Sequence, residues 1–278
     1  MRTELISIET DTAPLDGAFY LPDSGRASAG VMLFHGNTMN FYTGAPRFLP
    51  PVLTTRGLAC LAFNRRGHDI LTIRNDFVAE GAAFQLTREG IADNTFAAGW
   101  MAERGFASPV VIGHSNGGML GVQHVHDHPS TPALILLSAH RGGLSARESQ
   151  IKRGILAGMQ ADEVMARAET LVAAGRGREL LLLPGWWFAV SAESYVDRMT
   201  QMPDILEVAP KIKCPVLYIR GDQEPPSAIP AEEFQRQVGG RCNVEVIANC
   251  DHFYNGREDA VSGVVADWLT DIGIAARG

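Results

Sequence analysis

One serine of this sequence lies in a pattern that can produce a catalytic nucleophile. Residues 113–118 read Gly-His-Ser-Asn-Gly-Gly, after an apolar run and before a segment of helix length. Glycines two positions before and two positions after Ser115 allow a tight turn without Cβ clashes, which leaves the hydroxyl exposed at the end of a strand. The pattern therefore predicts a nucleophile elbow. A phosphate-binding loop is a weaker interpretation, because the segment contains neither G-x-G-x-x-G nor G-K-[ST].

A serine hydroxyl is a poor nucleophile until a base removes its proton, so the elbow predicts a carboxylate and then a histidine later in the chain. Two histidines, His140 and His252, follow the elbow without belonging to its helix. His140 comes directly after the strand expected at Ala133–Leu137, too early for an acid to intervene. His252 lies between the last expected strand and the last expected helix. We therefore expect His252 to be the general base.

The acid should lie in the loop after the expected strand that precedes the last one in the chain. Two carboxylates stand there. Val216–Ile219 is an apolar run, and Asp222 and Glu224 come shortly after it. Either side chain could accept the Nδ1 proton of the histidine and stabilise the imidazolium. Their positions alone do not separate them.

Two other clusters of side chains have competing interpretations. Residues 124–128 read His-Val-His-Asp-His, which could suggest a metal site. On a helix the central histidine points away from the other two, so a solvated helix end with cationic histidines is favoured. Trp186 and Trp187 precede a phenylalanine. They could form the ordinary core of a cap. Three adjacent aromatic side chains cannot all face one direction, however, so at least one is expected to line the mouth of a pocket.

The pattern of apolar runs predicts a doubly wound α/β sheet. An alternating antiparallel pair is expected first, at Thr3–Ile8 and Gly17–Leu21. Continuous apolar runs, typical of parallel strands buried on both faces, follow at Gly30–Phe34, Leu58–Phe63, Pro109–Ile112, Ala133–Leu137 and Val216–Ile219, with a more alternating candidate at Asn243–Ile247. Segments of helix length alternate with them at Ala45–Arg56, Arg88–Arg104, Gly117–His128, Ala231–Val238 and Arg257–Ile272.

One segment, Arg141–Met202, interrupts this alternation. It contains two stretches of helical pattern, Ser145–Leu156 and Ala161–Ala174, and no strand-like run of comparable quality. An insertion between two strands is expected to form a helical cap over the carboxyl edge of the sheet, where α/β sheets bind ligands. We therefore expect a core of residues 1–140 and 203–278 with a cap at 141–202.

These motifs resemble those of the α/β-hydrolase fold family. The resemblance is carried, in the family's order, by Leu-Phe-His-Gly-Asn at 33–37, Asn-Arg-Arg-Gly-His at 64–68, the elbow, Gly-Asp-Gln-Glu at 221–224 and Asp-His-Phe at 251–253. It covers nearly the whole chain outside 141–202, which looks like the family's variable cap. The family's usual acid lies three residues after a glycine. The resemblance therefore implies Glu224, a glutamate where aspartate is commoner, with Asp222 as the alternative.

An oxyanion hole is also implied. The elbow places the backbone N–H of Asn116 beside the reacting carbonyl. The resemblance implies that the second donor is the N–H of Asn37, in the loop after the Phe-His-Gly run. His35 and His114 stand beside these donors and are weaker candidates for substrate contact, and a structural role is the favoured interpretation of His35.

Composition excludes several other classes of protein. The 278 residues carry a net charge of −7 without a run of five like charges, so nucleic acid is not an expected partner. The apolar runs are far shorter than the roughly 20 residues that span a bilayer, and the acidic first thirty residues lack an apolar signal region. We therefore expect a cytoplasmic protein without membrane association. The four cysteines are expected to be free thiols, and no metal or organic cofactor is implied.

The sequence thus predicts a serine hydrolase with a Ser-His-Glu or Ser-His-Asp triad, acting on a carboxylic ester or related acyl bond of a mid-sized hydrophobic small molecule. Hydrolysis of a thioester, lactone, amide or C–C bond uses the same machinery and stays open. A non-catalytic, ligand-binding relative is the competing class, although binding alone requires no intact set of serine, histidine and acid. The sequence leaves the oligomeric state, monomer or homodimer, open.

Overall fold

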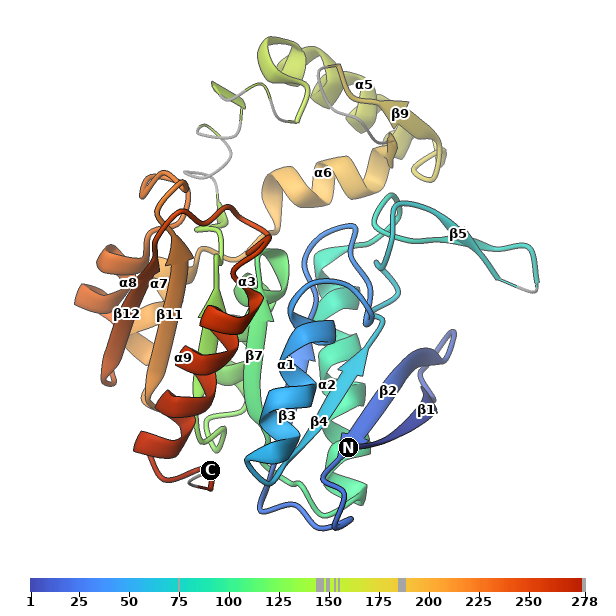
Figure 1. Ribbon diagram of the computed structural model, residues 1–278. Helices are drawn as coiled ribbons and strands as arrows, with labels where there is room; N and C mark the ends of the chain where they lie inside the picture. The colour runs from blue at the N-terminus through green and yellow to red at the C-terminus, as the bar shows by residue number, and fades with distance from the viewer. Residues whose placement is uncertain are drawn as a thin grey trace.

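An eight-stranded sheet lies at the centre of the computed structural model, which describes residues 1–74, 76–143, 148, 151–152, 154, 156–184 and 189–276. In spatial order its strands are β1 (Arg2–Ile8), β2 (Leu15–Leu21), β4 (Leu58–Phe63), β3 (Ala29–Phe34), β7 (Val110–His114), β8 (Leu134–Leu137), β11 (Val216–Gly221) and β12 (Cys242–Ile247). The pairings β1–β2 and β2–β4 are antiparallel, and every pairing from β4 to β12 is parallel. The predicted mostly parallel sheet, with an antiparallel pair at one edge, is confirmed (Figure 1).

Helices cover both faces of this sheet (Figure 1). One face packs against α1 (Ala45–Thr55) and α9 (Glu258–Asp271), and the other against α2 (Thr87–Glu103), α3 (Asn116–Asp127), α7 (Ile205–Val208) and α8 (Ala231–Gln237). Strand β3 shows the alternation that divides the two cores, because Val31 and Leu33 pack toward α1 and α9, whereas Met32 and Phe34 pack toward α2 and α3. The sheet is therefore doubly wound, as predicted.

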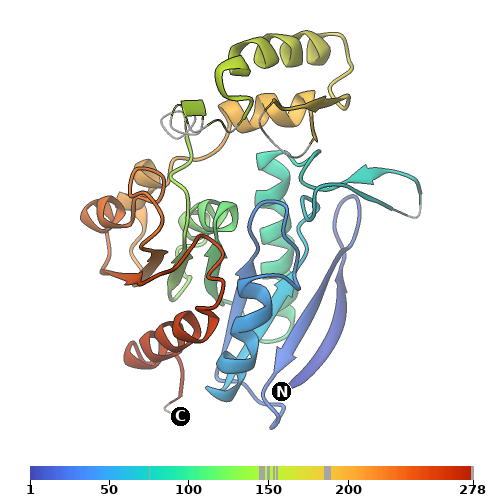
Figure 2. The ribbon, with the colours of Figure 1, turned by 45° about the horizontal axis from the view of Figure 1, so that its top comes forward.

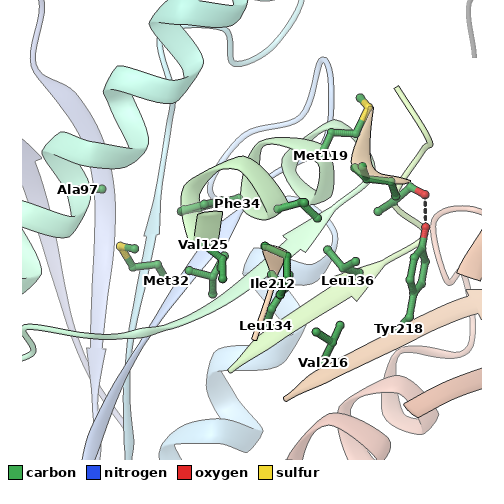
Figure 3. Packing of buried hydrophobic residues seen from close by; sticks show 14 of the residues in the cluster. Met32, Phe34, Ala97, Met119, Val125, Leu134, Leu136, Ile212, Val216 and Tyr218 are labelled. Carbon is green, nitrogen blue, oxygen red and sulfur yellow. Dashed lines mark hydrogen bonds between the residues drawn. The ribbon is translucent and has the colours of Figure 1, made fainter. Parts of the chain in front are cut away.

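The core on the α3 side reaches the carboxyl edge of the sheet (Figure 3). Leu134 and Leu136 of β8 lie beneath α3, and Tyr218 of β11 extends the same layer. The Tyr218 hydroxyl donates a hydrogen bond to the carbonyl oxygen of Ala139, just beyond β8. Buried packing thus fixes the carboxyl ends of β8 and β11, which lead into loops that carry residues of the site. All four cysteines are free, as predicted.

The described part of the chain between β8 and α7 lies above the carboxyl edge of the sheet (Figures 1 and 2). It includes a 3₁₀ turn (Gly158–Gln160), α5 (Ala161–Ala173), β9 (Leu180–Leu182), β10 (Ala189–Ser191) and α6 (Ala192–Thr200). Helix α5 confirms the helix predicted at Ala161–Ala174, whereas the helix predicted at Ser145–Leu156 falls mostly outside the described residues. The antiparallel β9–β10 pair corrects the expectation of a wholly helical segment, because three-residue strands are too short to show a period.

This segment has a hydrophobic cluster of its own, to which Leu171, Val190 and Tyr195 contribute. That observation supports a separate cap, and the division at residues 141–202 stays a prediction. A second short hairpin, β5 (Thr72–Ile73) and β6 (Ala79–Glu80), projects from the side of the molecule (Figure 1). In the described part of the chain, every helix is too short or too polar to cross a bilayer.

Candidate active site

Ser115 stands at the turn between β7 and α3 that the sequence predicts. Its φ of 54° and ψ of −118° are strained for a residue with a side chain. The flanking glycines are required by space: a Cβ on Gly113 would lie 2.3 Å from the carbonyl oxygen of Gly117, and one on Gly117 would lie 2.2 Å from that of Phe34. The glycines thus let the chain fold back while the serine itself takes the strained backbone conformation.

A continuous hydrogen-bond chain connects Ser115, His252 and Glu224. The Ser115 Oγ lies 3.0 Å from His252 Nε2, and His252 Nδ1 lies 2.6 Å from Glu224 Oε1. A hydroxyl, an imidazole and a carboxylate in this order can move the serine proton to the histidine and stabilise the resulting imidazolium. The three side chains come from the ends of β7, β12 and β11, which parallel pairing brings to one edge of the sheet.

The second oxygen of Glu224 is held by two donors. Glu224 Oε2 accepts hydrogen bonds from the Gly221 backbone N–H at 2.8 Å and from the Ser138 hydroxyl at 2.6 Å. The Ser138 oxygen in turn lies 2.7 Å from the Tyr254 hydroxyl. Burial by itself would raise the pKa of Glu224, but the hydrogen bonds from His252, Ser138 and Gly221 outweigh it and lower the pKa. The carboxylate is thereby kept charged and oriented.

Sequence reasoning missed Ser138 and Tyr254. Ser138 directly follows β8 and is fully buried with a φ of 46°, and Tyr254 is also buried. Ser138 could have been suspected as a polar residue at the carboxyl end of a buried strand. Tyr254 lies two residues after His252 and shows no signal in the sequence, because its contact with Ser138 depends on the turn that follows the histidine.

Two backbone N–H groups lie beside the serine without a protein acceptor. Asn116 is the first residue of α3, and Asn37 follows Gly36, where a Cβ would lie 3.0 Å from His114 Nδ1 and 3.4 Å from the Cβ of Ser115. Among the described residues, neither the N–H of Asn37 nor that of Asn116 donates a hydrogen bond. In the described part of the chain, neither N–H is therefore committed to a protein acceptor.

Comparison with known families agrees with this geometry. Residues 31–264 match the model of the Alpha/beta hydrolase family, well over half of the chain. The chain belongs to the alpha/beta hydrolase family. No curated protein sequence matches it.

Solved structures of other proteins share the fold of this alpha/beta hydrolase. Est1E from Butyrivibrio proteoclasticus is 18% identical, with a TM-score of 0.72 over 96% of this chain and 98% of that one. A highly thermostable carboxyl esterase from Bacillus coagulans is 15% identical, with a TM-score of 0.71 over 98% and 99%. Proline iminopeptidase from Mycobacterium smegmatis is 15% identical, with a TM-score of 0.63 over 97% and 98%. At these identities the likeness establishes the fold.

Asp222, the alternative acid, makes different contacts in this hydrolase. Its two carboxylate oxygens accept hydrogen bonds from the backbone N–H groups of Asn249 and Cys250, at 2.9 and 3.0 Å. These bonds lower the pKa of Asp222. Asp222 therefore fixes the loop that leads to His252, whereas Glu224 contacts the histidine ring.

The two histidines proposed as weak substrate contacts are buried and hydrogen-bond to protein groups, and Nδ1 of His114 has no hydrogen-bond partner among the described residues. His35 is fully buried; its Nε2 accepts from the Arg65 backbone N–H at 3.1 Å, and its Nδ1–H donates to the carbonyl oxygen of Gly36 at 2.8 Å. His114 is also buried and donates from Nε2 to the carbonyl oxygen of His252 at 2.9 Å. Burial, with the nearby His252, lowers the pKa of His114 to about 3, so the ring is neutral. Both side chains brace the backbone of the site.

The histidines of α3 require a correction. The prediction of a solvated, cationic helix end is wrong for His124, because its side chain is buried. Its ring stacks on the ring of His128 with 4.1 Å between the centroids and contacts the Phe34 ring edge to face. Burial lowers the pKa of His124 to about 3, so it carries no charge at neutral pH. In the part of the chain that the structure describes, no group of three histidine, cysteine or acidic side chains is arranged to hold a metal. Trp186 and Trp187, the predicted pocket-mouth residues, lie outside the described residues.

Proposed function

We propose that this alpha/beta hydrolase is a serine hydrolase that cleaves a carboxylic ester or a related acyl bond of a mid-sized small molecule. The observation that carries the proposal is the hydrogen-bond chain from Ser115 through His252 to Glu224. In the first step the Ser115 oxygen attacks the carbonyl carbon while His252 Nε2 takes the hydroxyl proton. Glu224 stabilises the imidazolium that forms.

The negative charge of the tetrahedral intermediate falls on the former carbonyl oxygen. The N–H groups of Asn37 and Asn116 are proposed to donate to it, each worth about 3–4 kcal/mol of transition-state stabilisation. The intermediate collapses as His252 returns the proton to the leaving alkoxide, which leaves an acyl group on Ser115. A water molecule, deprotonated by His252, then attacks the acyl carbon, and the acid and free serine are released.

Ester hydrolysis is favoured over the other acyl reactions because one of the structures described above, which shares this fold, is a carboxyl esterase. An iminopeptidase shares the fold as well, so amide hydrolysis by the same residues is the second candidate. The segment at 141–202 is proposed to cap the site and to select the substrate. Small-molecule substrates, a cytoplasmic location and independence from nucleic acid and membranes remain predictions from the sequence.

A fluorophosphonate probe tests the proposal, because it phosphonylates a serine that an adjacent base has activated. The wild-type protein should be labelled, and Ser115→Ala should not. A substrate panel of p-nitrophenyl ester, thioester, lactone, anilide and β-diketone, run on both proteins, should show the largest kcat/KM for the ester and no turnover by Ser115→Ala. Equal labelling of the two proteins, or turnover that survives Ser115→Ala, would overturn the proposed function.

A further inference from the structure

Helix α6 is joined to the core along one face by a row of hydrogen bonds. Its first bonds come from Ser191 N to Ala83 O at 2.7 Å and from the Ser194 hydroxyl to Gln85 O at 2.7 Å. Farther along, Asp197 accepts from the backbone N–H and the hydroxyl of Thr87 at 2.7 and 2.6 Å. These positions recur at intervals of three, so they share one face of the helix. These hydrogen bonds therefore hold helix α6 in place above the site.

Arg198 continues this row and reaches the loop of the proposed oxyanion hole. Its Nη2 donates to the carbonyl oxygen of Ala82 at 2.5 Å, and its Nη1 donates to the side-chain Oδ1 of Asn37 at 3.1 Å. Its Nε lies 3.4 Å from the Ser194 hydroxyl. One guanidinium thus joins α6, the segment before α2 and the loop after β3.

The main chain around Asn37 is held from both sides, because the Gly36 carbonyl oxygen accepts from His35 Nδ1 at 2.8 Å and the Asn37 carbonyl oxygen accepts from the Thr38 hydroxyl at 2.6 Å. Arg198 adds a contact to the side chain of Asn37. Met39 N donates to Gly36 O at 3.3 Å, which closes a turn around Asn37, and Thr38 has a φ of 60°. The Asn37 N–H itself has no acceptor in the described part of the chain. A charge-assisted hydrogen bond to the side chain of the same residue restrains its orientation.

We propose that Arg198 is a positioning residue that holds Asn37 so that its backbone N–H points at the developing oxyanion. The proposal rests on the proposed serine-hydrolase function and adds a role for α6. Burial lowers the pKa of Arg198 to about 10, so its guanidinium remains charged at neutral pH. Through this contact the capping segment is coupled to transition-state stabilisation as well as to substrate access.

The test compares Arg198→Met with Asn37→Ala, which break the same hydrogen bond from opposite ends. Each should lower kcat for a p-nitrophenyl ester about tenfold with KM changed less than about twofold, because removal of a whole oxyanion donor costs about 10²–10³ in kcat and here the donor is only loosened. The rate of fluorophosphonate labelling should fall by a similar factor, since charge also develops on the phosphoryl oxygen. The double variant should lose no more than the worse single variant, because both act through one contact.

Arg178→Met is the matched control. Arg178 donates to the carbonyl oxygen of Ala79 at 2.6 Å, so it also joins the capping segment to the segment before α2, and in the described part of the chain it makes no hydrogen bond to Asn37. It should keep the wild-type kcat. If Arg198→Met unfolds the protein, Asn37→Ala and Arg198→Lys carry the test by the same readouts.

Three results would overturn the inference: equal kcat for Arg198→Met and Arg178→Met, losses that multiply in the double variant, or a change confined to KM. The Ser115→Ala protein separates the two failures. If it is inactive while Arg198→Met and Asn37→Ala match wild type, only the positioning role is lost. If Ser115→Ala is active, the proposed function itself fails.

Discussion

Asp222 and Glu224 stand two residues apart in one loop and hold different parts of the same histidine segment. Glu224 accepts the Nδ1–H of His252 at 2.6 Å, while Asp222 accepts the N–H groups of Asn249 and Cys250, which precede that histidine. One carboxylate therefore contacts the ring and the other fixes its backbone. Substitution of each carboxylate can therefore distinguish the two candidates that the sequence left open.

Glu224→Gln should lower kcat by about 10⁴, the size of the effect when the acid of a triad is replaced by its amide, because the histidine is then held in the wrong tautomer. Asp222→Asn should lower kcat less than about tenfold, since the His252 loop keeps one of its two hydrogen bonds to the side chain. Steady-state kinetics on a p-nitrophenyl ester, with Tm measured for both variants, provides the comparison. The reverse ranking would transfer the role of the acid to Asp222.

Much of this site follows from the sequence because its residues stand at the carboxyl ends of buried strands. The apolar runs predicted the strands, and parallel pairing brings the ends of β7, β11 and β12 together. The separation of Glu224 from Asp222 could not be derived from the residues alone, because it depends on the path of one loop. Tyr254 and Arg198 could not be predicted for a different reason: each contacts the site across a long sequence separation, which no local pattern encodes.

The elbow glycines can be tested by adding a single methyl group. Gly117→Ala should abolish labelling by a fluorophosphonate or unfold the protein, because its Cβ would meet the carbonyl oxygens of Phe34 and His35 at 2.2 and 2.5 Å. Gly99→Ala, in the exposed middle of α2, is the control: its Cβ would meet nothing within 4 Å, and helix propensity should stabilise the protein by about 1 kcal/mol. Labelling and urea unfolding measure both. A fully active Gly117→Ala protein would contradict the geometry of the turn.

The free energy of unfolding should fall below neutral pH because His124 is buried and stays neutral in the folded protein. The pKa of His124 is lowered from 6.5 to about 3 in the folded protein, so below about pH 6.5 the unfolded chain binds the proton more readily. At pH 5 this costs about 2 kcal/mol of unfolding free energy relative to neutral pH. Urea unfolding between pH 7.5 and 4.5 should give a slope of unfolding free energy against pH that is shallower for His124→Gln than for wild type. Gly99→Ala, which changes no titratable group, should keep the wild-type slope, and a His124→Gln slope equal to it would rule the contribution out.

The hydroxyl of Ser138 should matter for catalysis although it lies two contacts from the imidazole. Ser138→Ala removes one of the two donors to Glu224 Oε2 and leaves that buried oxygen with the Gly221 N–H alone, so the carboxylate can rotate away from His252. We expect kcat to fall about tenfold with KM nearly unchanged. Tyr254→Phe should have a smaller effect, because the Ser138 hydroxyl can still donate to Glu224 without the tyrosine. If both variants kept the wild-type kcat, Glu224 would be held by Gly221 and His252 alone, and the buried hydroxyl pair would serve only packing.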